Sequence, residues 1–166
     1  LRVAGYAPTV VDTAKVELDA RAVSQADVVA ISVPMHTALR LALALAAAVR
    51  VQRPDIVIAL FGLYAPLNAE HILASGGDLA LGPEDIAVLV ELCRAIDRGD
   101  RRDVAVNMAR LAVTERGLKP QRASNHEIDR KGLLPLQRYA RLVVDGHEVN
   151  VAHVEASRGC KHTCRH

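Results

Sequence analysis

Two cysteines and two histidines alternate at the end of the printed sequence, at a spacing that suits metal chemistry. Cys160 and Cys164 form a C-x3-C pair, and His162 and His166 follow each thiol by two residues. Thiolates bind zinc and iron–sulfur clusters, and imidazole also binds zinc. Two interpretations stay open from the residues alone: a zinc site built from the two cysteines and one or two of the histidines, and two cysteines on neighbouring helical turns with no role.

A predicted strand leads directly into these cysteines. The stretch VNVAHVEAS, from Val149, alternates apolar and polar residues, as a half-buried β-strand does. A strand with ligands at its carboxyl end indicates the start of a second domain, at residues 147–166. We assign residues 100–146 to a polar linker, in which Asp103 to Thr114 has helical character and LQRYARL forms a brief element.

Residues 1–99 are predicted to form an α/β domain with a doubly wound parallel sheet of the flavodoxin or Rossmann kind. Continuous apolar runs at 26–34, 55–62 and 78–82 predict strands, the first two buried on both faces. Helices are expected over 37–52, 67–74 and 84–98, the first capped by Thr37 and the last opened by Pro83. Alternating strands and helices are typical of a parallel sheet with helices on both faces.

The first residues have the pattern of a helix end followed by a short strand. LRVAGY is interpreted as the last turn of a helix that Gly5 closes, and TVVD (Thr9 to Asp12) as a short strand. We therefore expect the sheet to lack its first strand.

Three polar loops follow the predicted strands: PMHT (34–37), GLYAPLNAE (62–70) and GPED (82–85). Parallel sheets of this kind bind ligands beyond the carboxyl ends of their strands. Ordinary turns have little need of Tyr64, Pro66 and Asn68 together, so these loops predict a ligand site. His36 is a candidate metal ligand there, although a single histidine beside a helix start is more often a surface or capping group.

The strand followed by SRGC (157–160) resembles the opening of the barrel of radical S-adenosylmethionine enzymes. In that family C-x3-C-x2-C follows the first strand of a β/α barrel, and the third cysteine would stand directly after His166. The resemblance implies a four-iron four-sulfur cluster on Cys160, Cys164 and that third thiol, with S-adenosylmethionine on the open iron and a separate electron donor. With two of the three ligands, the chain by itself is expected to be inactive.

Residues 1–99 resemble the cobalamin-binding domain that precedes the barrel in many of these proteins. Ser32, Gly62 and the stretch GGDLALGPED match the family pattern, with Pro83 in place of a glycine, which removes one backbone N–H. DRKGLLPLQRYARLV (129–143) resembles the connector of the subgroup named for a Cys- or selenocysteine-containing C-terminal tail. The cobalamin-binding residues that the resemblance implies are Ser32, Pro34, Met35, His36, Thr37, Gly62, Leu63, Tyr64, Ala65, Pro66, Asn68, Gly82 and Glu84.

The chain is thus interpreted as a fragment of a cobalamin-dependent radical S-adenosylmethionine enzyme. The resemblance implies methyl transfer to an unactivated carbon, with the substrate unknown. The rival interpretation is a non-enzymatic flavodoxin-like ligand-binding module with a zinc-binding Cys/His tail. Neither interpretation supplies a catalytic side chain here, because no paired acid and base or activated nucleophile is visible; Cys93 is predicted to pack in a helix.

Composition narrows the classes of protein that fit the sequence. Apolar residues make up 51% of the chain and aromatic ones 2%, so the core is expected to be aliphatic. A net charge of +2 does not indicate a nucleic-acid surface. No apolar run reaches the roughly 18 residues of a membrane span. Three cysteines do not indicate a disulfide framework, and we expect a cytoplasmic protein.

Overall fold

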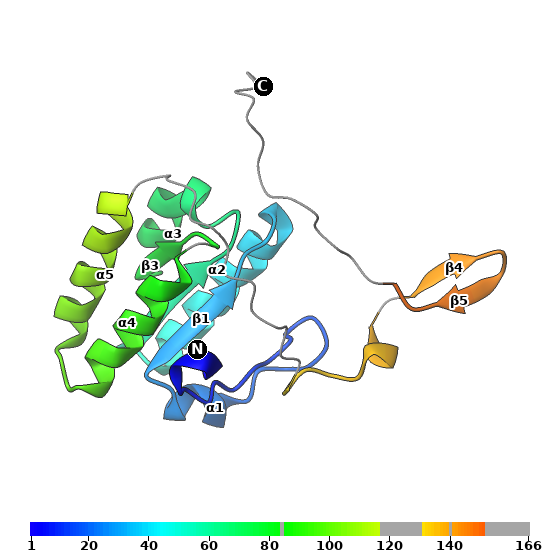
Figure 1. Ribbon diagram of the computed structural model, residues 1–166, viewed down its shortest axis with the longest axis horizontal. Coiled ribbons are helices and arrows are strands. Elements are labelled where there is room, and N and C mark those ends of the chain that lie inside the picture. The colour runs from blue at the N-terminus through cyan, green and yellow to red at the C-terminus, as the bar shows by residue number, and fades with distance from the viewer. Residues whose placement is uncertain (84, 117–130, 140, 152–166) are drawn as a thin grey trace, which may run out of the picture. The chain divides into compact units, whose positions relative to one another are not determined.

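The computed structural model describes residues 1–83, 85–116, 131–139 and 141–151, and the chain divides into two compact units, Leu1–Asp129 and Arg130–His166. The first unit contains three strands and five α-helices among its described residues (Figure 1). In chain order these are α1 (Ala20–Gln25), β1 (Val28–Ser32), α2 (His36–Gln52), β2 (Val57–Phe61), α3 (Ala69–Ala74), β3 (Leu79–Leu81), α4 (Ile86–Asp97) and α5 (Arg102–Arg116).

The three strands form one parallel sheet in the order β1-β2-β3. Ser32 pairs with Phe61, which pairs with Leu81, so all three strands end at the same level. The described residues therefore form an α/β unit with a parallel sheet, as the sequence predicts. The common end point matters for function because it brings the three following loops to one edge.

Helices cover both faces of the sheet. Side chains alternate along β2, so Ile58 and Leu60 pack in one core with α2 and α3, while Val57 and Ala59 pack in the other with α4 and α5. Helix α2 is rich in alanine, a strong helix former, and buries one stripe. That stripe consists of Leu39, Ala42, Ala46 and Val49.

Strand β1 differs from the prediction that it is buried on both faces. Ala30 and Ser32 are exposed, whereas four of the five residues of β2 are buried. Since β1 lies at the edge of the sheet, it has a strand neighbour on one side, and the described helices α4 and α5 pack against β2 and β3. The strand that is buried on both faces is the central one, β2.

One further prediction is wrong near the amino-terminal end of the chain, and one helix there was not predicted. Residues 9–12 form no strand; they follow Pro8 in an irregular segment, and Val10 is exposed. The unpredicted helix is α1, which Asp19 caps by accepting a hydrogen bond from the Arg21 N–H at 2.8 Å. The predicted turn at Gly5 is present as a 3-10 turn, Arg2–Ala4, closed by Gly5 at a φ of 89°.

The helix boundaries differ in smaller ways. Thr37 does not cap α2, because the helix begins at His36 with Met35 in the cap position and no capping side chain. The helix predicted over 67–74 is a 3-10 turn, Pro66–Asn68, followed by α3. Helix α4 begins at Ile86, three residues after Pro83, with Asp85 at its cap.

Helix α5 belongs with the sheet rather than with a connecting segment. Its buried residues Ala105, Val106 and Ala109 share a core with α4 and β3, and the first compact unit runs to Asp129. The linker predicted from Asp100 onward therefore contains a helix that completes one face of this unit. The sequence predicts helical character for Asp103 to Thr114 but not its packing against the sheet unit, because α5 buries only a narrow apolar stripe.

The second unit contains, among its described residues, a 3-10 turn, Leu136–Arg138, and an antiparallel hairpin of β4 (Leu142–Val144) and β5 (His147–Val149). Asp145 and Gly146 form its two-residue turn, with φ of 49° and 79° as a type I′ turn requires. The strand predicted from Val149 is placed differently: β5 ends there. Whether a barrel strand follows lies outside the described residues.

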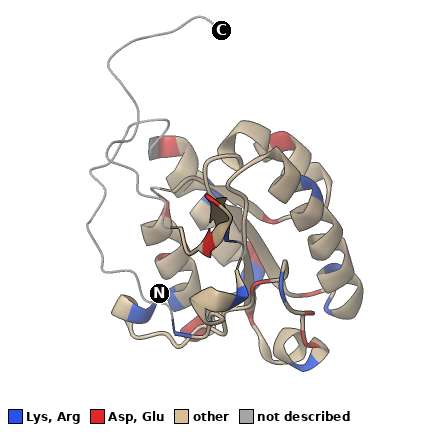
Figure 2. Cartoon of the chain, turned by 90° about the vertical axis from the view of Figure 1, so that its right-hand side faces the viewer, with Lys and Arg blue, Asp and Glu red and all other residues tan. Residues whose placement is uncertain are grey.

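Among the residues that the structure describes, no helix combines the length and apolarity needed to cross a membrane. Charged residues of both signs are spread over the elements (Figure 2). Several of them form Arg–Asp pairs.

Candidate functional site at the carboxyl edge of the sheet

The loop after β1 is held by its main chain. Val33 is fully buried; its N–H donates to the Phe61 carbonyl at 2.7 Å, and its carbonyl accepts from the Tyr64 N–H at 3.1 Å. The predicted site residues around it, Ser32, Pro34, Met35, His36 and Thr37, are all exposed. Their side chains are therefore free of the core.

His36 has one polar neighbour among the described residues. Its Nε2 lies 3.3 Å from the Thr37 hydroxyl oxygen, at the first turn of α2. A neutral imidazole in this position is chemically able to bind a metal or to donate a hydrogen bond.

The loop after β2 passes very close to the loop after β1. The Gly62 N–H donates to the Leu81 carbonyl at 3.0 Å, and Gly62 has a φ of 124°. A Cβ atom at this position would lie 2.8 Å from the Val33 carbonyl oxygen, which is closer than real Cβ atoms approach. Glycine is required here for two reasons, the backbone conformation and the close approach.

The rest of this loop is folded on itself. Ala65 is fully buried, so its side chain packs in the core rather than facing solvent. The Asn68 side-chain amide donates to the Tyr64 carbonyl at 2.8 Å and closes the turn ahead of α3. Tyr64 and Pro66 are half-buried, while Leu63 is 55% exposed.

The loop after β3 contains a buried carboxylate that sequence reasoning missed. Asp85 is 8% exposed, and its carboxylate accepts a short hydrogen bond from the buried Gly82 N–H. Asp85 thus fixes the turn that carries Gly82, a predicted site residue. Its position before an apolar helical run suggests a helix cap, but its carboxylate bonds to Gly82 rather than to the first turn of α4. Glu84, also predicted, lies outside the described residues.

The three loops therefore meet at one edge, and the structure brings together the predicted residues that follow β1 and β2. Exposed hydroxyls and an imidazole stand beside exposed apolar side chains: Met35 is 56% exposed, and Leu67, after β2, is 76% exposed. Such a mixed, open surface suits a large ligand with both polar and apolar parts. Two hollows lie elsewhere, one at the amino edge of the sheet and one between α4 and α5.

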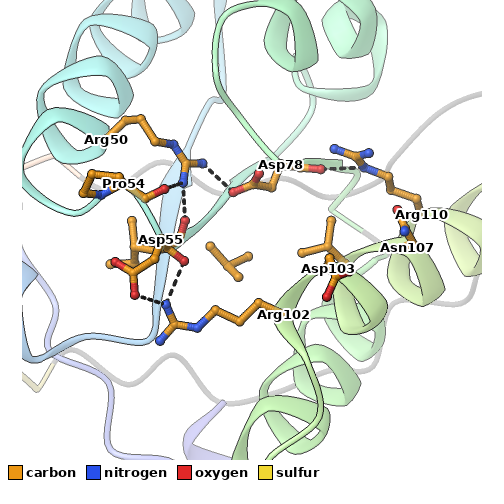
Figure 3. Close-up of a pocket in the computed structure, with 11 residues that line it drawn as sticks. Arg50, Pro54, Asp55, Asp78, Arg102, Asp103, Asn107 and Arg110 are labelled. Carbon is orange, nitrogen blue, oxygen red and sulfur yellow. Dashed lines mark hydrogen bonds and ion pairs between the residues drawn. The ribbon is translucent and has the colours of Figure 1, made fainter.

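The opposite, amino edge of the sheet is held by arginine side chains. Arg50 donates to the carbonyls of Pro54, Ile56 and Gly76 at 2.9, 2.6 and 3.1 Å, and to the Asp78 carboxylate at 2.6 Å (Figure 3). Asp78 also accepts the Ile58 N–H at 2.8 Å. One guanidinium thus joins the end of α2 to the starts of β2 and β3.

A second arginine fixes the segment before β2. Arg102 of α5 donates to the Asp55 carbonyl at 2.7 Å and to its carboxylate at 2.6 Å. The Arg53 guanidinium, with help from Arg102, lowers the pKa of Asp55 to about 2. Both arginines stabilise the ionised carboxylate by direct hydrogen bonds.

The predicted metal ligands Cys160 and Cys164, and His162 and His166 beside them, lie outside the described residues. Within the described ranges, no group of three or more His, Cys, Asp or Glu side chains is placed to hold a metal ion. Cys93 is half-buried in α4, and burial raises the pKa of its thiol, which favours the protonated form.

Comparisons of the chain with protein-family models, with curated proteins and with solved structures gave no match. The functional assignment therefore rests on the residues, their placement and the resemblance of the motifs.

Proposed function

We propose that this chain is part of a cobalamin-dependent radical S-adenosylmethionine enzyme, and that the carboxyl edge of its sheet binds the cobalamin. The observation that carries the proposal is the meeting of three loops at one edge, where main-chain bonds hold the loops after β1 and β2 together while the side chains of residues 34–37, after β1, remain exposed. An edge of this kind is where parallel α/β sheets bind their ligands.

The chemistry of the edge fits a corrinoid. Met35, Leu63 and Leu67 offer exposed apolar contacts for a flat macrocycle. The Ser32 and Thr37 hydroxyls are able to bond to the amide groups around its rim. Gly62 allows the first two loops to approach each other, so that both would contribute to one surface. When bound, the cofactor would supply the methyl-carrying or radical-tuning chemistry.

In this proposal Cys160 and Cys164 supply two thiolates to the four-iron four-sulfur cluster, on the strength of their spacing and of the SRGC stretch. The role of this chain's residues is to bind and orient the cofactors. S-adenosylmethionine, an electron donor and a substrate accepting a methyl group on an unactivated carbon follow from the resemblance alone.

A cobalamin-binding measurement tests the first part. Equilibrium dialysis of the chain against hydroxocobalamin should show saturable binding, and Leu63→Asp should weaken it about tenfold or more, the equivalent of losing one buried apolar contact. Leu111→Asp is the matched control, because Leu111 is 61% exposed on α5 and belongs to none of the three loops. Absence of binding, or an equal effect of the control, would contradict the proposal.

Metal content tests the second part and separates it from the rival. Sequencing the coding DNA should show a cysteine codon directly after His166. The chain extended by that residue should then bind iron and sulfide after anaerobic reconstitution, and Cys160→Ser should abolish this. One equivalent of zinc, lost in the same variant and without cobalamin binding, would instead identify the flavodoxin-like module with a zinc tail.

A further inference from the structure

A hollow of about 320 Å³ opens at the amino edge of the sheet, at the opposite ends of the strands from the proposed cobalamin surface. Helix α5 forms one wall, and the end of α2, the segment before β2 and the start of β3 form the rest (Figure 3). Its volume falls within the range of small-molecule sites, which begins at about 300 Å³.

Most of the charge around this hollow is neutralised within the protein. Arg50 is paired with Asp78, and Arg102 with Asp55, as described above. The third carboxylate of the lining, Asp103, is paired with Arg101 at 2.8 Å. These groups have little capacity left for a charged ligand, because each ionic partner is already satisfied.

Arg110 is the charged residue of the lining that forms no ion pair with a described residue. Its Nε–H donates to the Asp78 carbonyl at 2.9 Å, which orients the guanidinium, but no carboxylate neutralises it. Its two terminal nitrogens make no hydrogen bond to a described residue. Asn107 stands one turn earlier on α5, and its side-chain amide is likewise without a described partner. Figure 3 shows the two side chains next to each other at one end of the hollow.

We infer that this hollow is a second ligand site, which binds the oxyanion of a small molecule through Arg110 and Asn107. The terminal nitrogens of an arginine match two oxygens of a carboxylate or phosphate, and the amide provides a further donor. The bond from Nε to the Asp78 carbonyl holds the side chain in place, which lowers the entropy lost when an anion binds. This site is independent of the proposed cobalamin surface.

An NMR titration of the ¹⁵N-labelled chain tests the site. Inorganic phosphate and acetate are added in separate series, with chloride lowered to keep the ionic strength constant. We expect saturable shifts of the Asn107 side-chain amide and the Arg110 Nε–H. Stronger binding of phosphate would indicate a phosphorylated ligand, and stronger binding of acetate a carboxylate ligand; both support the site.

Two variants and a control decide the outcome. Arg110→Ala should weaken binding about tenfold or more, in line with the loss of a charged hydrogen bond, and Asn107→Ala should weaken it less. Asn107 has no described bond to lose, so this variant tests the site without affecting the fold. Arg40→Ala removes the same charge from an exposed position on α2 that lines no part of the hollow. Shifts that do not saturate, or an equal loss in Arg40→Ala, would overturn the inference.

Discussion

The two edges of the sheet are held together in different ways. At the amino edge the join is made by side chains: Arg50 and Arg102 bond to carbonyls and carboxylates of two separate segments, one before β2 and one before β3. At the carboxyl edge, the main chain does it, through bonds between Val33, Phe61 and Tyr64 and between Gly62 and Leu81. The arginines that join the amino edge are occupied. At the carboxyl edge, Asn68 and Asp85 bond within their own loops, while the side chains of residues 34–37 stay exposed.

This difference explains why the predicted site residues after β1 are exposed and still well placed. Ser32, His36 and Thr37 contribute little to the packing, and their positions are set by backbone bonds beneath them. A rigid backbone with free side chains is what a ligand site requires. At the amino edge the same freedom is left to Arg110 and Asn107.

Gly62→Ala should disrupt the carboxyl edge and cause the largest loss in the free energy of unfolding. The new Cβ would meet the Val33 carbonyl oxygen, and the left-handed backbone would be strained. These two costs together predict a loss of about 3 kcal/mol or more in the free energy of unfolding, measured by urea denaturation.

Gly76→Ala is the matched control for that variant. Gly76 also has a positive φ, 93°, but no atom lies within 4 Å of the position of its Cβ. It should lose about 1 kcal/mol from backbone strain alone. Equal losses in the two variants would show that the contact with Val33 is unimportant.

Arg50→Ala should disrupt the amino edge and cause the next largest loss in the free energy of unfolding. Four hydrogen bonds are lost, and the Asp78 carboxylate, 28% exposed, is left without its cation. We expect a loss of about 2 kcal/mol in the free energy of unfolding. Arg50→Lys should recover little of it, because a single ammonium group cannot reach all four acceptors. Full recovery by lysine would show that charge alone, and not the fork of donors, matters here.

The sequence predicted the parts of the fold that have a strong periodic signal. The apolar runs around Ile31, Ile58 and Leu79 are strands, and their alternation with helices gave the parallel sheet and the common edge of the three loops. The arginine bonds of the amino edge could not be predicted, since Arg102 and Asp55 lie 47 residues apart and no local pattern connects them. The packing of α5 against the sheet unit was missed for a similar reason. Its apolar stripe is narrow, and the structure shows that α4, its packing partner, covers that stripe.

The variant Asp55→Asn tests whether charge contributes to the amino edge, through the pH dependence of the free energy of unfolding. The pKa of Asp55 is lowered from 3.8 to about 2, so the ionised form stabilises the fold. A lowered pKa means that this contribution is complete above about pH 4 and is lost as the pH falls towards 2. The stability difference between the wild type and Asp55→Asn should therefore be constant near neutral pH and shrink across that window. Asp55 is largely exposed, so the effect should be small and weakened by salt. A difference that does not change with pH would show that the hydrogen bonds, and not the charge, matter.

Thr37→Ala should have the smallest effect, and this is what the carboxyl edge requires if its side chains are free. Thr37 is exposed and does not cap α2; its hydroxyl lies 3.3 Å from the His36 imidazole and makes no bond to the helix main chain. The free energy of unfolding should change by less than about 0.5 kcal/mol. Asp19→Ala is the control, because Asp19 does cap α1 and its loss should cost about 1 kcal/mol. If Thr37→Ala were as costly as Asp19→Ala, this side chain would be part of the structural framework, and the carboxyl edge would resemble the amino edge after all. If it is neutral for stability but weakens cobalamin binding, its hydroxyl belongs to the ligand surface.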